Sequence, residues 1–232
     1  PLDRQTLIKD DSGTVPKGHR LSVLKLNHML RFQTGIYPYS VMTSVFAPVN
    51  DHGGPRFSPA KIAFTAQEWC GQVYQQISPE GEQLFSTVRS YFASEGESDR
   101  RLSISPDALY EDALLIQLRE LDGPFADGGD WRGQLVPALW RLRKAHQRLA
   151  PVDATIRRRE VTVGGQAVTR FIVRFGQVQR TIDVQKVHPR RVLSWRESAD
   201  EQATLLATTR LAYWKLNGPD GTIYRKQLGL TP

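Results

Sequence analysis

The string Gln67–Gln72 holds the residues best suited to chemistry: Glu68 lies two positions before Cys70, the single cysteine of the chain. Residues two apart in a strand share one face. The apolar alternation of residues 62–66 continues through Glu68 and Cys70, whereas residues 73 and 77 carry the opposite parity. We therefore expect the acid and the thiol to point inward, with a β-bulge or sharp strand bend at Cys70-Gly71.

Two interpretations of this string are open. In one, Cys70 is a nucleophile whose base is His28, His146 or His188, brought near by the fold. In the other, Cys70 is a small buried residue beside a bend, and Glu68 pairs with an arginine. No two of the five histidines lie two or four residues apart, and one cysteine permits no internal disulfide. We expect neither a metal nor another cofactor.

Bulk composition is that of an ordinary globular chain. The 232 residues are 40% hydrophobic and carry a net charge of +7, and this length suits one large domain or two small ones. Because no domain linker is evident, we expect a single β-rich domain over 1–232. Basic residues are scattered along the chain rather than grouped in blocks, which disfavours nucleic acid as a partner.

No apolar run is long enough for a transmembrane segment. Phosphate-cradling glycine loops and the Gly-x-Ser-x-Gly motif are absent. A pair of carboxylates for the hydrolysis of glycosides cannot be assigned, because Glu111 and Asp112 are expected on a helix surface.

The elements that must position any site are mostly strands. From residue 156 the chain predicts an antiparallel meander with turns at Gly164-Gly165, Gly176-Gln177 and His188-Pro189. These turns pair Phe171 with Ile182, Ile182 with Trp195, Val184 with Leu193 and Arg180 with Glu197. A closing strand is expected through residues 205–213. One face of the meander would carry Thr169, Phe171, Val173, Phe175, Ile182, Val184, Leu193 and Trp195.

Three consecutive arginines, 157–159, begin this region. In a strand they must point to both faces, so the strand is either an edge or the lining of a wet concavity. Arg158 and Arg180 would share the face of Phe171. An apolar surface with two arginines suits an amphipathic anion such as a lipid, and the alternative is an edge strand that its charges protect from aggregation.

Helices are expected to be few. Ser105 as N-cap, Pro106 in the first turn and a leucine stripe predict a central helix that ends at Asp122-Gly123-Pro124. Residues 137–149 predict a short helix, with a strand over 135–142 as the alternative. A short C-terminal helix ends before Gly229. The fold class is mainly β (α+β): an antiparallel, strongly curved sheet or open half-barrel.

Two strings, Leu30–Phe46 and Gln67–Gln72, together with Arg89–Phe92 and the tail Tyr213–Leu230, resemble a family of uncharacterised bacterial exported, lipoprotein-like β-rich proteins. Some members are labelled septum formation inhibitors. The resemblance implies a location in the cell envelope, periplasmic or associated with the outer membrane, and names no reaction. Members have strand-like sequence before the first string, which implies that an N-terminal strand is missing here.

The leading functional expectation is a non-enzymatic cell-envelope protein. It would bind an apolar or amphipathic ligand, or an envelope protein partner, in a concavity of the sheet. The alternatives are an enzyme centred on Glu68, Cys70 and a histidine, and a structural envelope component. The candidate lining residues are Tyr37, Glu68, Trp69, Cys70, Phe171, Arg180, Trp195 and Glu197.

Overall fold

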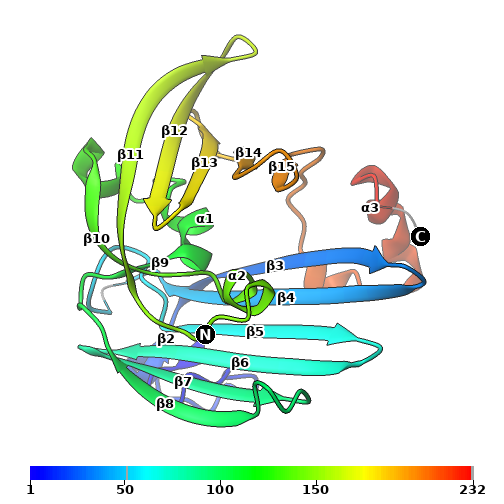
Figure 1. Ribbon diagram of the computed structural model, residues 1–232. Coiled ribbons are helices and arrows are strands. Elements are labelled where there is room, and N and C mark those ends of the chain that lie inside the picture. The colour runs from blue at the N-terminus through cyan, green and yellow to red at the C-terminus, as the bar shows by residue number, and fades with distance from the viewer. Residues whose placement is uncertain (51, 231–232) are drawn as a thin grey trace.

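A computed structural model describes residues 1–50 and 52–230, and two open sheets dominate it (Figure 1). One has six strands in the order β3-β4-β5-β6-β7-β8, and the other has seven in the order β15-β14-β13-β12-β11-β10-β9. The mainly β class is therefore confirmed. Neither sheet is closed or strongly curled, so the expected half-barrel is wrong. The strands instead form two separate sheets, and the segment between β8 and β10 connects one sheet to the other.

The six-stranded sheet is a plain meander. Each strand pairs antiparallel with its successor. Alternate residues of β5, among them Ile62 and Phe64, are buried, as the period of two predicts. The strands are β3 (Val23–Thr34), β4 (Tyr37–Pro48), β5 (Lys61–Glu68), β6 (Gly71–Glu80), β7 (Gln83–Ser90) and β8 (Glu97–Ser103).

The seven-stranded sheet contains the predicted meander. Phe171 lies opposite Ile182, and Ile182 opposite Trp195, as the turn residues predicted. A register shift after Asp183 places Val184 opposite Val192 rather than Leu193. The strands are β9 (Leu109–Tyr110), β10 (Trp131–Val136), β11 (Val152–Val163), β12 (Gln166–Phe175), β13 (Val178–Gln185), β14 (Val192–Arg196) and β15 (Gln202–Thr204).

Two parts of this sheet differ from expectation. Strand pairing ends at Thr204, so the closing strand over residues 205–213 is wrong. β11 pairs with β10 only up to Ile156, so Arg157–Arg159 lie where β11 has a neighbour on one side alone. This agrees with an edge strand carrying charge. The β9–β10 pair is parallel, unlike its neighbours.

The predicted central helix is reduced to short turns. Leu109-Tyr110 form β9, and the helical part is η2 (Glu111–Ala113) followed by α1 (Leu114–Gln117). The backbone N–H of Ser105 donates to the Gln134 side chain instead of beginning a helix. The apolar stripe is broad because the segment is buried on two sides. Leu114 belongs to the core of the seven-stranded sheet, and Ile116 to that of the six-stranded sheet.

The other helices lie where the sequence predicts them. α2 (Leu139–Lys144) buries Leu139 and Leu142 against the six-stranded sheet, and α3 (Thr222–Gln227) precedes Gly229. No helix of the described residues is long and apolar enough to cross a membrane. The remaining short elements are β1 (Leu2–Asp3), β2 (Arg20–Leu21), η1 (Lys17–His19), η3 (Phe125–Gly128), η4 (Tyr213–Lys215) and η5 (Pro219–Gly221).

Candidate functional site

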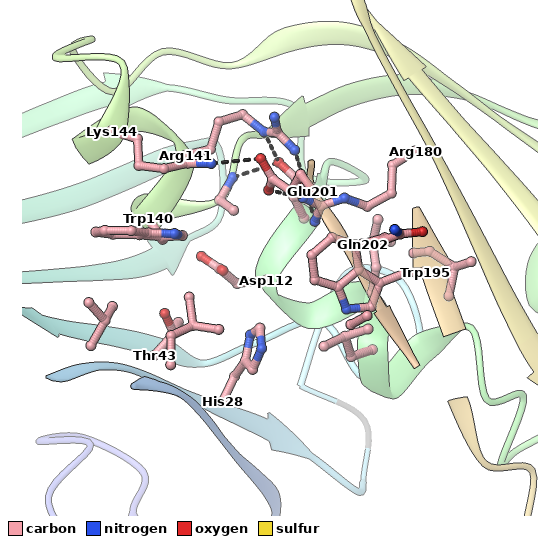
Figure 2. Close-up of a pocket in the computed structure, with 18 of the residues that line it drawn as sticks. His28, Thr43, Asp112, Trp140, Arg141, Lys144, Arg180, Trp195, Glu201 and Gln202 are labelled. Carbon is pink, nitrogen blue, oxygen red and sulfur yellow. Dashed lines mark hydrogen bonds and ion pairs between the residues drawn. The ribbon is translucent and has the colours of Figure 1, made fainter. Parts of the chain in front are cut away.

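A cavity of about 620 Å³ is bounded by both sheets (Figure 2). β3 and β4 provide one wall, β12 to β15 provide the facing wall, and η2, α1 and α2 supply residues in between. The residues that matter most for its chemistry are His28, Phe32, Thr43, Asp112, Trp140, Arg141, Lys144, Arg180, Ile182 and Trp195.

Aromatic and aliphatic side chains form much of the wall. The Trp140 ring, from α2, lies 6.0 Å from that of Phe32 and 6.4 Å from that of Phe64, measured between centroids. Val173 and Ile182 line the side contributed by the seven-stranded sheet. An apolar molecule placed between these walls would lose contact with water, which is favourable by about 25 cal/mol for each Å² of apolar surface buried.

Ion pairs close one end of the cavity. Glu111 accepts hydrogen bonds from the Ala138 N–H at 2.9 Å and from Arg141 at 2.6 Å, and lies 3.0 Å from Arg180. Glu197 binds the same two arginines, at 2.5 Å and 2.9 Å. Burial opposes the ionisation of Glu197, but the hydrogen bonds and charges of the two arginines outweigh it and lower its pKa.

Asp112 differs from the neighbouring carboxylates. One of its oxygens, Oδ2, accepts the Leu139 N–H at 3.0 Å. Its other oxygen has no hydrogen-bond or ion-pair partner among residues 1–50 and 52–230. The carboxyl lines the cavity and points into it (Figure 2). Burial, aided by the Glu111 charge, raises the pKa of Asp112 to about 7, against the opposing effects of the Leu139 N–H and the two arginines.

His28 reaches the same cavity from β3, on the opposite sheet (Figure 2). Burial lowers the pKa of His28, and the charge of Arg180 lowers it further. The imidazole is therefore neutral at pH 7 and has one N–H donor and one nitrogen acceptor. The cavity thus holds a carboxyl that is about half ionised at pH 7 together with a neutral imidazole.

The predicted site residues on the meander lie together around this end. Arg180 and Trp195 line the cavity, and the Arg180 guanidinium lies 4.8 Å from the Trp195 ring centroid. Glu197 forms ion pairs with Arg141 and Arg180 but does not itself line the cavity. Phe171 is fully buried and packs edge-on against Phe125, so it supports the wall and does not line it.

The other four predicted residues lie elsewhere, at one end of the six-stranded sheet. Glu68 pairs with Gly71, so Trp69 and Cys70 form a two-residue hairpin turn and both are exposed. Trp69 stacks on Tyr37 at 5.6 Å. The expectation that Cys70 points inward past a bulge or bend is wrong, because the chain reverses at Trp69-Cys70, which also explains the change of parity, whereas Glu68 is half-buried. A hydrogen bond from Tyr39 to Glu68 raises the pKa of Tyr39 to about 12.

Sequence reasoning named His28 only as a base for Cys70, and it missed four other residues that give the cavity its character: Thr43, Asp112, Trp140 and Arg141. Glu111 and Asp112 were expected on a helix surface, whereas both face the ion-paired end of the cavity. A signal was present, since two adjacent carboxylates sit between the leucines of an otherwise apolar segment. Such acids are buried only when they are paired or have a shifted pKa.

No family model, curated protein or solved structure matches this chain. Within the described residues, no group of three or more His, Cys, Asp or Glu side chains is arranged to hold a metal ion. The cavity between the sheets is therefore the feature from which a function is argued.

Proposed function

We propose that this protein binds a small amphipathic molecule in the cavity between its two sheets. The observation that carries the proposal is the cavity itself, about 620 Å³ in volume, with apolar walls and the Asp112 carboxyl pointing into it. Sites for small ligands are typically concave, mostly apolar and supplied with a few polar groups that orient the ligand. A location in the bacterial cell envelope belongs to the same proposal and rests on the sequence resemblance alone.

The apolar walls and the polar groups of the cavity suit a ligand that has one apolar part and one polar part. Its apolar part would lie between Trp140 and Ile182, which come from opposite sides of the cavity. Its polar part would meet Asp112 and His28, which have hydrogen-bonding capacity directed into the same space. A ligand without a polar group would leave the free oxygen of Asp112 buried without a partner, which is unfavourable.

The competing functions have less support. Cys70 is exposed at a hairpin turn, and no hydrogen bond between it and a histidine is found in the described chain. An enzyme centred on Glu68 and Cys70 therefore lacks the base that would activate the thiol. A purely structural envelope component would not need an open space of this size between its layers, since protein interiors are usually close-packed.

Calorimetric titration with 1-decanol, a neutral amphipath, tests the proposal. The unmodified protein should bind it saturably with one molecule per chain. Ala203→Trp should weaken binding by about tenfold or more, because Ala203 lies opposite Trp195 on edge strand β15 and lines the cavity, so an indole there fills the space. The matched control is Ala167→Trp, at an exposed position of β12 outside the cavity; it should bind like the unmodified protein.

Two results would overturn the proposal. One is the absence of saturable binding of 1-decanol by the unmodified, folded protein. The other is equal binding by Ala203→Trp and Ala167→Trp, which would place the alcohol outside the cavity. Circular dichroism spectra of both variants establish that each is folded before the comparison is made.

A further inference from the structure

The charged groups around the cavity form a nearly balanced set. Three cations, Arg141, Lys144 and Arg180, are ion-paired with three carboxylates, Glu111, Glu197 and Glu201. Arg180 contacts all three carboxylates, and Arg141 contacts two of them. Each of these three cations therefore already has a carboxylate partner. Arg31 of β3 also borders the cavity and forms no ion pair in the described chain, but it is exposed, and it alternates with His28 and Phe32 and so belongs to the other face of the strand.

Two carboxyl groups that line the cavity stand outside this set: Asp200, which is exposed to water, and Asp112. The Oδ2 of Asp112 is used by the Leu139 N–H, and no cation of the described residues forms an ion pair with it. The Asp112 carboxyl points into the cavity that His28 and Thr43 also line (Figure 2). Asp112 is half-buried, and enclosing a carboxylate without a cation is unfavourable, so a cation supplied by a ligand would satisfy it.

We infer that the cavity selects amphipathic amines, with the ammonium group of the ligand on the free oxygen of Asp112 and its apolar chain between Trp140 and Ile182. This inference rests on the proposed function. An ammonium group has three N–H donors. Asp112 accepts one, and the hydroxyl of Thr43 and a ring nitrogen of His28 are acceptors that line the same cavity.

An anionic ligand fits this arrangement less well. A carboxylate or sulfate would have to displace Glu111 or Glu197 from Arg141 and Arg180, whose hydrogen bonds are short. It would also approach Asp112, a like charge. The inference therefore differs from the sequence-based expectation of an amphipathic anion, which counted the arginines but not the carboxylates that hold them.

Three probes with the same decyl chain and different head groups separate the possibilities: decylamine, 1-decanol and undecanoate (whose carboxylate carries the decyl chain), titrated calorimetrically into the whole protein at pH 8. Decylamine should bind at least about tenfold more tightly than either of the others, the effect expected of one charge-assisted hydrogen bond. Asp112→Asn should remove this advantage, so that decylamine binds this variant no more tightly than 1-decanol does. Asp153→Asn, at an exposed position outside the cavity, is the matched control.

The affinity for decylamine should also rise between pH 6.5 and pH 8 and should lose this dependence in Asp112→Asn. The charged and titratable groups around the cavity are Glu111 beside Asp112, Arg141 and Lys144 on α2, Arg180 on β13, His28 and Arg31 on β3, and Glu197, Asp200 and Glu201 near β14 and β15. Burial lowers the pKa of His28, and Asp112→Asn retains His28, so a pH dependence that is lost in this variant belongs to Asp112.

The outcomes distinguish the inference from the function on which it rests. If 1-decanol binds and decylamine has no advantage, or if undecanoate binds as tightly as decylamine, the amine selectivity is overturned and the binding function stands. If Asp112→Asn binds decylamine as the unmodified protein does, Asp112 is not the partner and the inference is overturned. If none of the three probes binds, the proposed function fails together with the inference.

Discussion

Asp112 is a carboxyl group held in a cavity without a cation, and this makes the stability of the protein depend on pH. Its pKa is about 7 in the folded state, raised mainly by burial, whereas an aspartate in an unfolded chain has a pKa of about 3.9. Between these values the folded state holds a proton that the unfolded state has released. The contribution therefore favours folding at low pH, falls by about 1.4 kcal/mol per pH unit as the pH rises toward 7, and is constant above it.

Replacing Asp112 with asparagine should remove this loss. The amide oxygen can still accept the Leu139 N–H, and the side chain stays neutral. The free energy of unfolding of Asp112→Asn, relative to the unmodified protein, should increase by about 2 to 3 kcal/mol between pH 5 and pH 8. Urea denaturation at the two pH values measures it.

The difference between the two proteins cancels other groups that titrate in this range, among them His28. The free energy of unfolding of Asp153→Asn should change between pH 5 and pH 8 by the same amount as that of the unmodified protein. If the same is true of Asp112→Asn, the carboxyl is ionised at pH 5 in the folded protein and its enclosure in the cavity is wrong.

At the scale of elements, Glu111 joins three of them. It lies in η2, accepts the backbone N–H of Ala138 just before α2, binds Arg141 on α2 and contacts Arg180 on β13. Its side chain is 2% exposed. Glu111→Gln should lower the free energy of unfolding by about 1.5 to 3 kcal/mol, because two half-buried guanidinium groups each lose one of the carboxylates that pair with them while keeping Glu197. Urea denaturation at pH 7 measures it.

Glu80→Gln is the matched control, because Glu80 is exposed at the end of β6. It should leave the free energy of unfolding unchanged. A Glu111→Gln protein as stable as this control would show that the ion pairs around the cavity are not needed to hold η2, α2 and β13 together.

The elements also show how far a sequence can be interpreted. The glycine turns at residues 164–165 and 176–177 predicted the β11-β12-β13 register correctly, because short turns fix the pairing of the strands they join. The turn at Trp69-Cys70 was missed, because a bulge and a reversal produce the same change in apolar parity. The leucine-rich segment before Asp122 was interpreted as a helix, because burial on two sides imitates a broad helical stripe.

The site was harder to predict than the fold for a physical reason. Arg180, Trp195 and Glu197 were found because local pairing within one meander places them together. His28 and Asp112 come from separate elements, and only the packing of one sheet against the other brings them to one cavity. Strand alternation contains no information about that packing.

At the scale of the whole molecule, the cavity couples the two sheets. β3 at the edge of the six-stranded sheet and β15 at the edge of the seven-stranded sheet both contribute to its walls. A ligand in the cavity therefore contacts both sheets. Binding stabilises the folded state by about 2.7 kcal/mol when the free ligand is at 100 times its Kd.

Hydrogen exchange measured with and without saturating 1-decanol should locate this effect. Amides of β3 and β4 and of β13 to β15 should exchange more slowly with ligand, because local opening of either wall would release it. β7 and β8, on the far side of the six-stranded sheet from β3, should change little under conditions in which exchange occurs by local opening. Ala203→Trp, whose cavity is filled, should show no ligand-dependent protection. Protection confined to one sheet would mean that the alcohol binds on a single surface and that the two sheets do not share the site.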